Sequence, residues 1–177
     1  MKITDLECYS LLIPDFDADA CSSAQDNLIV KIHTDEGLIG IGETDTNPWG
    51  VKAIIDSPGT HAMGRGFKEL LVGKDPRNVE GLWHEMNEKT MMTTRRGLGI
   101  CAIGAIDMAL WDLCGKIYSQ PTWKLLGGSV KKEITPYASL LPEGRTLKDY
   151  SDSLVKKTVK AKELGFKAAK LEICIKG

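Results

Sequence analysis

The sequence predicts an α+β domain followed by the first βαβ unit of a parallel sheet, and three patterns in the 177 residues support this fold class. Strand-like runs separated by turns occupy residues 2–43, helical periodicity dominates from about residue 51 to 118, and a strand–helix–strand pattern comes after it. We therefore predict two domains, residues 1–128 and residues 129–177.

Three strand-like runs predict an antiparallel meander at the start of the chain. The first covers residues 2–13 and ends at Pro14, which has no N–H for a ladder. The other two, residues 27–34 and 38–43, flank Asp35-Glu36-Gly37, whose glycine suits a three-residue hairpin. We predict solvated loops at residues 15–27 and 44–50, both rich in turn residues.

The helical region contains one strong amphipathic pattern and one clear start signal. Asp75-Pro76 is typical of a helix start, with a capping carboxylate before a proline at the first helical position. Residues 99–117 predict a long helix, because large aliphatic residues recur at steps of three and four. Small residues in it should let neighbouring backbones approach closely: Gly99, Ala102, Gly104, Ala105 and Ala109.

The remaining chain reads as a βαβ unit with a strand at 133–141, a helix at 146–164 and a strand at 168–175. Thr146 and Asp149 are spaced as a capping box, and Gly165 supplies a left-handed helix stop. Parallel strands must be covered on both faces, which two strands and one helix cannot achieve. We therefore expect the chain to be a fragment of a longer α/β protein.

Composition excludes several classes of function. Lys plus Arg number 23 against 24 Asp plus Glu, so no charged field favours nucleic acid or an anionic membrane surface. The most apolar run, residues 97–106, is shorter than the roughly 20 residues of a membrane span, and the N-terminus has no continuous apolar export segment. Five cysteines without a Cys-x-x-Cys pair fit reduced thiols in a cytoplasmic protein.

One segment carries a family resemblance. Residues 102–127, AIGAIDMALWDLCGKIYSQPTWKLLG, closely resemble the first signature of the mandelate racemase and muconate lactonizing enzymes of the enolase superfamily, with Thr122 as a departure. Gly40-Ile-Gly-Glu43 and the Gly-Phe-x-Ala-x-Lys run at residues 165–170 fall in the family's order. The resemblance implies a capping domain followed by the first βαβ of an incomplete TIM-type (β/α) barrel, with active-site residues at the carboxyl ends of barrel strands.

The signature also contains three charged residues on one helix face: Asp107, Asp112 and Lys116. Their spacing is typical of a solvated helix face with an i,i+4 ion pair. We interpret these charges as scaffold and not as catalytic groups.

The candidate catalytic residues are Lys170 and Glu172. Period-2 alternation places both on one face of the last strand, which would point into a barrel. The family pattern is Lys-x-Lys, whose second lysine removes a proton α to a carboxylate, whereas this chain has Lys170-Leu171-Glu172. A carboxylate stabilises the charged form of a lysine and makes it a poorer base. The pair is either a structural ion pair or a clamp, with Lys170 holding the substrate carboxylate and Glu172 in an acid–base or polar role.

Substrate contacts are assigned to two cap loops and the first barrel strand. Residues 15–27 and 44–50 correspond in position to the family's loops that close over the barrel mouth. Trp49 is the candidate wall contact, with packing at a loop base as the alternative. Tyr137 and Ser139 could also line the mouth.

The resemblance implies Mg²⁺, held by three acidic residues on later barrel strands, so its ligands are expected beyond Gly177 and none in this chain. The histidines His33, His61 and His84 match no metal or base motif.

Taken together, these features predict a Mg²⁺-dependent enzyme that abstracts the proton α to a carboxylate. Dehydration of a sugar acid is the favoured reaction, and a racemase, epimerase or cycloisomerase is the alternative. An interpretation of another class is a truncated, non-catalytic fragment or assembly module. The expected partners are a small carboxylate substrate and further copies of the chain in a homo-oligomer, because a sheet edge and core would be exposed.

Overall fold

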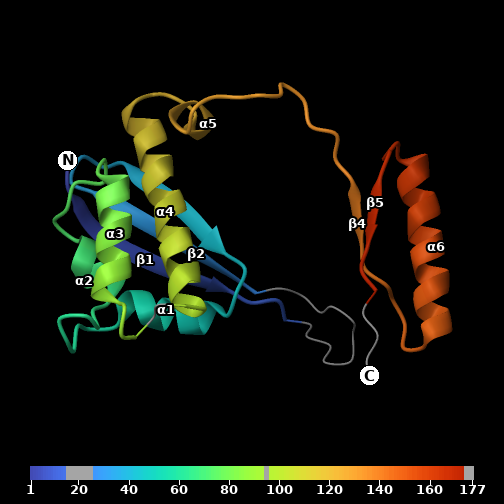
Figure 1. Cartoon of the computed structure of the whole chain (residues 1–177), viewed down its shortest axis with the longest axis horizontal. Helices are drawn as coiled ribbons and strands as arrows, with labels where there is room; N and C mark the ends of the chain where they lie inside the picture. Colours follow the sequence, from blue (N-terminus) through green and yellow to red (C-terminus); the bar gives the residue numbers. More distant parts are fainter. Residues whose placement is uncertain (15–25, 94–95, 174–177) are drawn as a thin grey trace. The chain divides into compact units, whose positions relative to one another are not determined.

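The structure, a computed structural model, describes residues 1–14, 26–93 and 96–173. Contacts divide the chain into two compact units, whose elements Figure 1 shows. The described part of the first lies in residues 1–12, 26–93 and 96–129, and the second is built mainly on residues 130–173. Most of the predicted loop at residues 15–27 lies outside the described residues.

The first unit is built on a three-stranded antiparallel sheet in the order β1-β2-β3, as predicted. Its strands are β1 (Ile3–Leu11), β2 (Asn27–Thr34) and β3 (Ile39–Thr44). Gly37 turns the hairpin between β2 and β3 at φ 81°, a conformation that favours glycine. Alternate residues of β2 are fully buried, so one face of the sheet belongs to the core.

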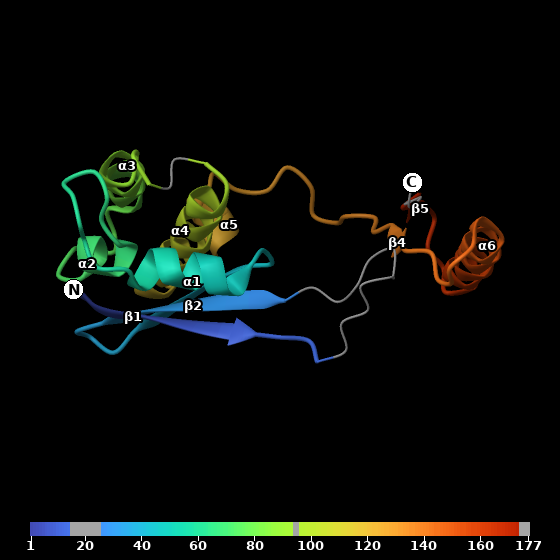
Figure 2. The same ribbon diagram turned by 90° about the horizontal axis from the view of Figure 1, so that it is seen from below.

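Within the described residues of this unit, the helices cover one face of the sheet, as Figure 2 shows. They are α1 (Pro48–Asp56), α2 (Phe67–Leu71), α3 (Val79–Lys89), α4 (Leu98–Ile117) and α5 (Thr122–Leu125). The core forms between them and the sheet, where Phe67, Met86 and Ile106 are fully buried. The fold class predicted for the capping domain is confirmed.

Helix α4 lies unusually close to strand β3, and glycines on the strand explain why. A Cβ at Gly42 would overlap the backbone carbonyl of Ala105, and one at Gly40 would overlap that of Ala109. Ala105 and Ala109 are fully buried at this contact, as the small-residue pattern predicted. Gly104 has no atom near its missing Cβ, so the expected close approach at that position is wrong.

Among the described residues, only α4 has the length and apolar composition of a membrane-crossing helix. Its buried face packs in the core of the first unit, and a core helix has the same length and composition, so these two properties alone do not assign a membrane span.

Two predicted helix starts are wrong, and in both places a side chain forms a local hydrogen bond that the sequence pattern did not indicate. The predicted loop at residues 44–50 ends early, because Asn47 accepts a hydrogen bond from Gly50 N–H and starts α1 with a proline at its first position. Asp75-Pro76 does not start α3; Asp75 accepts from Arg77 N–H in a turn, and the helix begins after Asn78.

The second unit is a βαβ unit with β4 (Ala138–Leu140), α6 (Leu147–Glu163) and β5 (Ala169–Leu171). The two strands are parallel, as predicted. Thr146 and Asp149 form the predicted capping box, and Gly165 ends the helix at φ 92°. Both strands are shorter than expected, because each pairs with a single neighbouring strand over only three residue pairs. Residues 174 and 175 of the predicted second strand lie outside the described residues.

Candidate active site

Parallel pairing of β4 with β5 positions four of the predicted site residues. Ser139 lies opposite Lys170 in the register, so their side chains leave the same face of the two-stranded sheet. Tyr137, two residues before Ser139, belongs to the same alternation. Ala138, on the opposite face of β4, and Ala161 of α6 are buried, whereas Ala169 of β5 is exposed. The helix therefore covers part of one face, and the candidate site residues share the other.

Lys170 and Glu172 form an ion pair, with 2.9 Å between Lys170 Nζ and Glu172 Oε1. The side chains are 49% and 39% exposed, so water reaches both. The hydrogen bond and negative charge of Glu172 raise the pKa of Lys170 above its ordinary value, and Tyr137 adds to this in the same direction. Lys170 is therefore protonated at neutral pH, a state that can bind an anion but cannot accept a proton.

The backbone fixes the position of Glu172 as well. Its N–H donates to Leu140 O at 3.1 Å, which extends the β4–β5 pairing one residue past β5. The pair thus lies at the carboxyl end of a parallel strand, the edge at which open α/β sheets and barrels place their ligands. At this edge Lys170 can bind an anionic group, and Glu172 can accept a hydrogen bond or a proton from a neighbouring hydroxyl.

Trp49 belongs to the other unit. It is the second residue of α1, not a loop residue, and it is 61% exposed. Exposure on this scale leaves an indole face available for contact with another molecule.

Comparison with known proteins identifies the family. The profile of the mandelate racemase / muconate lactonizing enzyme N-terminal domain matches residues 14–127. The chain belongs to this family. The match includes the signature segment in α4 and ends at the glycines before the βαβ unit.

Curated proteins similar to this chain include sugar-acid dehydratases. A D-galactonate dehydratase family member of Marinomonas sp. is 33% identical over 85% of this chain and 34% of its own length. An L-rhamnonate dehydratase of Saccharopolyspora erythraea is 33% identical over 63% of this chain and 26% of its own. The chain thus spans about a third or less of the length of these relatives.

Solved structures extend the likeness through the βαβ unit. The 3,6-anhydro-D-galactonate cycloisomerase of Zobellia galactanivorans has a TM-score of 0.80 and 34% identity, covering 98% of this chain and 43% of its own. An isomerase of Streptomyces coelicolor has a TM-score of 0.71 and 28% identity, covering 96% and 44%. The likeness therefore includes the strands that carry Ser139 and Lys170 and is not limited to the signature.

Within residues 1–14, 26–93 and 96–173, the structure contains no cluster of three or more His, Cys, Asp or Glu side chains that could hold a metal ion. Glu172 has a lysine, not further acids, beside it. The donor set present does not fit a divalent cation. The histidines bind nearby groups instead: His33 Nε2 lies 2.9 Å from Glu7 Oε2, and His61 Nδ1 accepts from Met63 N–H.

Sequence reasoning missed the role of two charges in the signature. Asp112 and Lys116 form the predicted i,i+4 ion pair at 2.7 Å. They also reach across to strand β3, where Asp112 accepts from Ile41 N–H and Lys116 donates to Ile39 O. The position of both residues one turn apart, facing a Gly-x-Gly strand, is the signal that could have revealed this contact.

Proposed function

We propose that the chain is part of an enzyme that removes the proton α to the carboxylate of a small substrate, and that the favoured reaction is dehydration of a sugar acid. The observation that carries the proposal is the Lys170–Glu172 pair at the carboxyl end of β5, beside Ser139 and Tyr137. The dehydratase names of the curated relatives support the reaction class.

Lys170 is assigned to hold the substrate carboxylate. Its ammonium is kept charged by Glu172, and its position beside Ser139 gives the anion a second donor, the serine hydroxyl. A substrate carboxylate would compete with Glu172 for Lys170. Glu172 released from the pair is then free to accept a hydrogen bond or a proton from a substrate hydroxyl.

Trp49 is assigned to the apolar wall of the substrate site, and Tyr137 to its mouth. Mg²⁺ is the proposed cofactor, and when bound it would stabilise the negative charge that develops on the carboxylate of an enolate. Since the donor set around Glu172 does not fit the cation, its ligands are assigned to residues after Gly177. No step assigned to Lys170 or Glu172 depends on it.

An isomerase of the same family is the second candidate, because the solved structures that match include a cycloisomerase and an isomerase. The two candidates share removal of the α-proton and differ in the fate of the enolate. Loss of a hydroxyl gives a dehydration product, whereas return of a proton or ring closure gives an isomer.

The test uses the parent protein expressed from its full coding sequence. Sugar acids are incubated with it and Mg²⁺ in D₂O and followed by proton NMR. We expect loss of the α-proton signal together with a dehydration product, and at least tenfold lower kcat/KM for Lys170→Ala, with partial retention in Lys170→Arg. Isomers without dehydration would support the second candidate. Full activity in Lys170→Ala would remove the clamp assignment.

A further inference from the structure

The two edges of the first unit's sheet differ in how their backbone groups are satisfied. On β3, side chains of α4 close the edge at Ile39 and Ile41. On β1, Ile3 exchanges hydrogen bonds with the 73–74 turn at 2.8 Å, and Leu6 N–H donates to Asp5 Oδ1 at 2.9 Å. These contacts protect the first half of β1 and leave its second half open.

Alternation along the strand identifies the open groups. Because Leu6 N–H points away from β2, the N–H and C=O groups of Cys8 and Ser10 also point away from it. Within the part of the chain that the structure describes, neither N–H meets a side chain or a loop. The N–H and C=O groups of Cys8 and Ser10, four groups in all, therefore form one unpaired edge.

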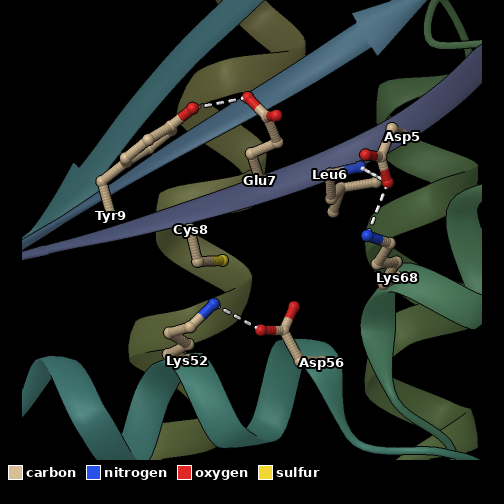
Figure 3. A pocket seen from close by; sticks show the side chains of 8 residues that line it. All are labelled: Asp5, Leu6, Glu7, Cys8, Tyr9, Lys52, Asp56 and Lys68. Carbon is tan, nitrogen blue, oxygen red and sulfur yellow. Dashed lines mark hydrogen bonds and ion pairs between the residues drawn. The ribbon is translucent and has the colours of Figure 1, made fainter.

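A groove accompanies this edge. Figure 3 shows it between β1 and the helices α1 and α2, with the Cys8 side chain directed into it. It has a volume of about 520 Å³. Two ion pairs line it, Lys52 with Asp56 and Lys68 with Asp5, both at 2.6 Å, and Glu7 adds a carboxylate that accepts a hydrogen bond from the Tyr9 hydroxyl. Because most of this charge is neutralised within the groove, the groove does not select a strongly charged partner.

We propose that β1 pairs antiparallel with β1 of a second copy of this chain, about a two-fold axis at Tyr9. In this register Cys8 lies opposite Ser10 of the second copy, and the reciprocal pair forms on the other side of the axis. The four open groups of each copy then form four inter-strand hydrogen bonds. A register centred on Cys8 is worse, because it requires Leu6 N–H, which Asp5 already occupies.

Side chains agree with this register. Tyr9, which is 43% exposed, lies beside Tyr9 of the second copy and buries part of its ring there. Glu7 lies opposite Leu11, so no like charges face each other across the strands. The interface is a continuous six-stranded sheet, and a second copy is the one partner that supplies a matching edge by symmetry.

Cysteine cross-linking tests the register in the 177-residue chain. Tyr9→Cys in a Cys8→Ser background should form a disulfide between copies under mild oxidation, because residues at the axis lie opposite each other in a non-hydrogen-bonded pair. Glu7→Cys in the same background is the matched control, since position 7 lies opposite position 11. Peptide mapping identifies the linked cysteines. Absence of a 9–9 link at concentrations where the chain is dimeric overturns the proposal.

Proline substitution tests the hydrogen bonds separately. Ser10→Pro removes an N–H that points away from β2, so the β1–β2 ladder is kept while two inter-copy bonds are lost. We expect the dissociation constant of the dimer, measured by sedimentation equilibrium, to rise at least about tenfold, while the circular dichroism spectrum stays unchanged. Val130→Pro, at a fully exposed position outside every helix and strand, should leave the dimer unchanged. A chain that is monomeric throughout, or dimers equally stable with Ser10→Pro, would refute the interface.

Discussion

The Asp112 carboxylate accepts a hydrogen bond from the backbone N–H of Ile41 at 2.8 Å, which joins helix α4 to the outer edge of strand β3. Lys116 completes the link by donating to Ile39 O at 2.6 Å while it pairs with Asp112. An exposed strand edge is a site for unwanted pairing, and these two charges close it. The most recognisable charges of the family signature are therefore structural in this chain.

Replacing Asp112 by Ala should lower the free energy of unfolding by about 1–2 kcal/mol, because Ile41 N–H loses its partner and Lys116 its counter-ion. Asp152→Ala is the matched control, since Asp152 pairs only with Lys148 on an exposed helix face and should cost less than about 0.5 kcal/mol. Urea unfolding followed by circular dichroism measures both. Equal effects for the two variants would mean that the contact with β3 contributes nothing.

Gly42→Ala should be among the most damaging single changes in the first unit. Its Cβ would overlap the carbonyl of Ala105, and neither backbone can move without separating α4 from β3. We expect a loss of about 3 kcal/mol or more. Gly104→Ala, with open space around it, should instead stabilise helix α4 by up to about 1 kcal/mol. Thermal melts of both variants check the opposite signs.

The turn before α3 gives a pH dependence. Hydrogen bonds from Arg77 lower the pKa of Asp75 to about 2, below its ordinary value near 4. Because the folded-state pKa is depressed, the stabilisation is present above about pH 4 and is lost as the pH falls toward 2. The Asp75 side chain is 43% exposed, so solvent screens the pair, and Asp75→Asn should cost less than about 1 kcal/mol at pH 7 and nothing near pH 2. Unfolding curves at both pH values test this, and a cost independent of pH would contradict it.

Periodicity in the sequence was sufficient to predict the meander, the long helix α4 and the parallel βαβ unit. Each depends on repeated apolar positions, such as Ile103, Ile106, Leu110 and Leu113, all buried as expected. The errors came at helix starts. Asn47 caps α1 through its side chain, and Asp75 accepts from Arg77 N–H in a turn before α3; such contacts of one residue with its own turn leave no periodic signal.

The candidate site was predictable only in part. Alternation places Lys170 and Glu172 on one face, and the ion pair results from that placement. The strand register that brings Ser139 beside Lys170 depends on pairing between segments about 30 residues apart, which sequence patterns do not specify. The contacts of Asp112 with β3 were missed for the same reason.

The stability of a Trp49→Ala variant separates the two roles proposed for this residue, packing within the fold and contact with a ligand. With most of its surface exposed on α1, Trp49→Ala should change the free energy of unfolding by less than about 1 kcal/mol. Phe67→Ala, at a fully buried position, should cost about 3–5 kcal/mol under the same conditions. A loss above about 2 kcal/mol for Trp49→Ala would favour packing at the base of the helix over a substrate contact.

The charge state of Lys170 can be measured without any enzymatic assay. Glu172 raises the pKa of Lys170 through a hydrogen bond and its charge, so Glu172→Gln should lower that pKa toward the ordinary lysine value. Glu172→Lys, which restores the Lys-x-Lys pattern, should lower it further, because two ammonium groups repel each other. Glu163→Gln, on α6 beside Lys160, is the control and should leave Lys170 unchanged. NMR titration of the Lys170 side chain in the 177-residue chain reads each value directly. If all three variants titrate alike, Glu172 does not set the pKa of Lys170, and the ion pair contributes nothing to keeping this lysine protonated.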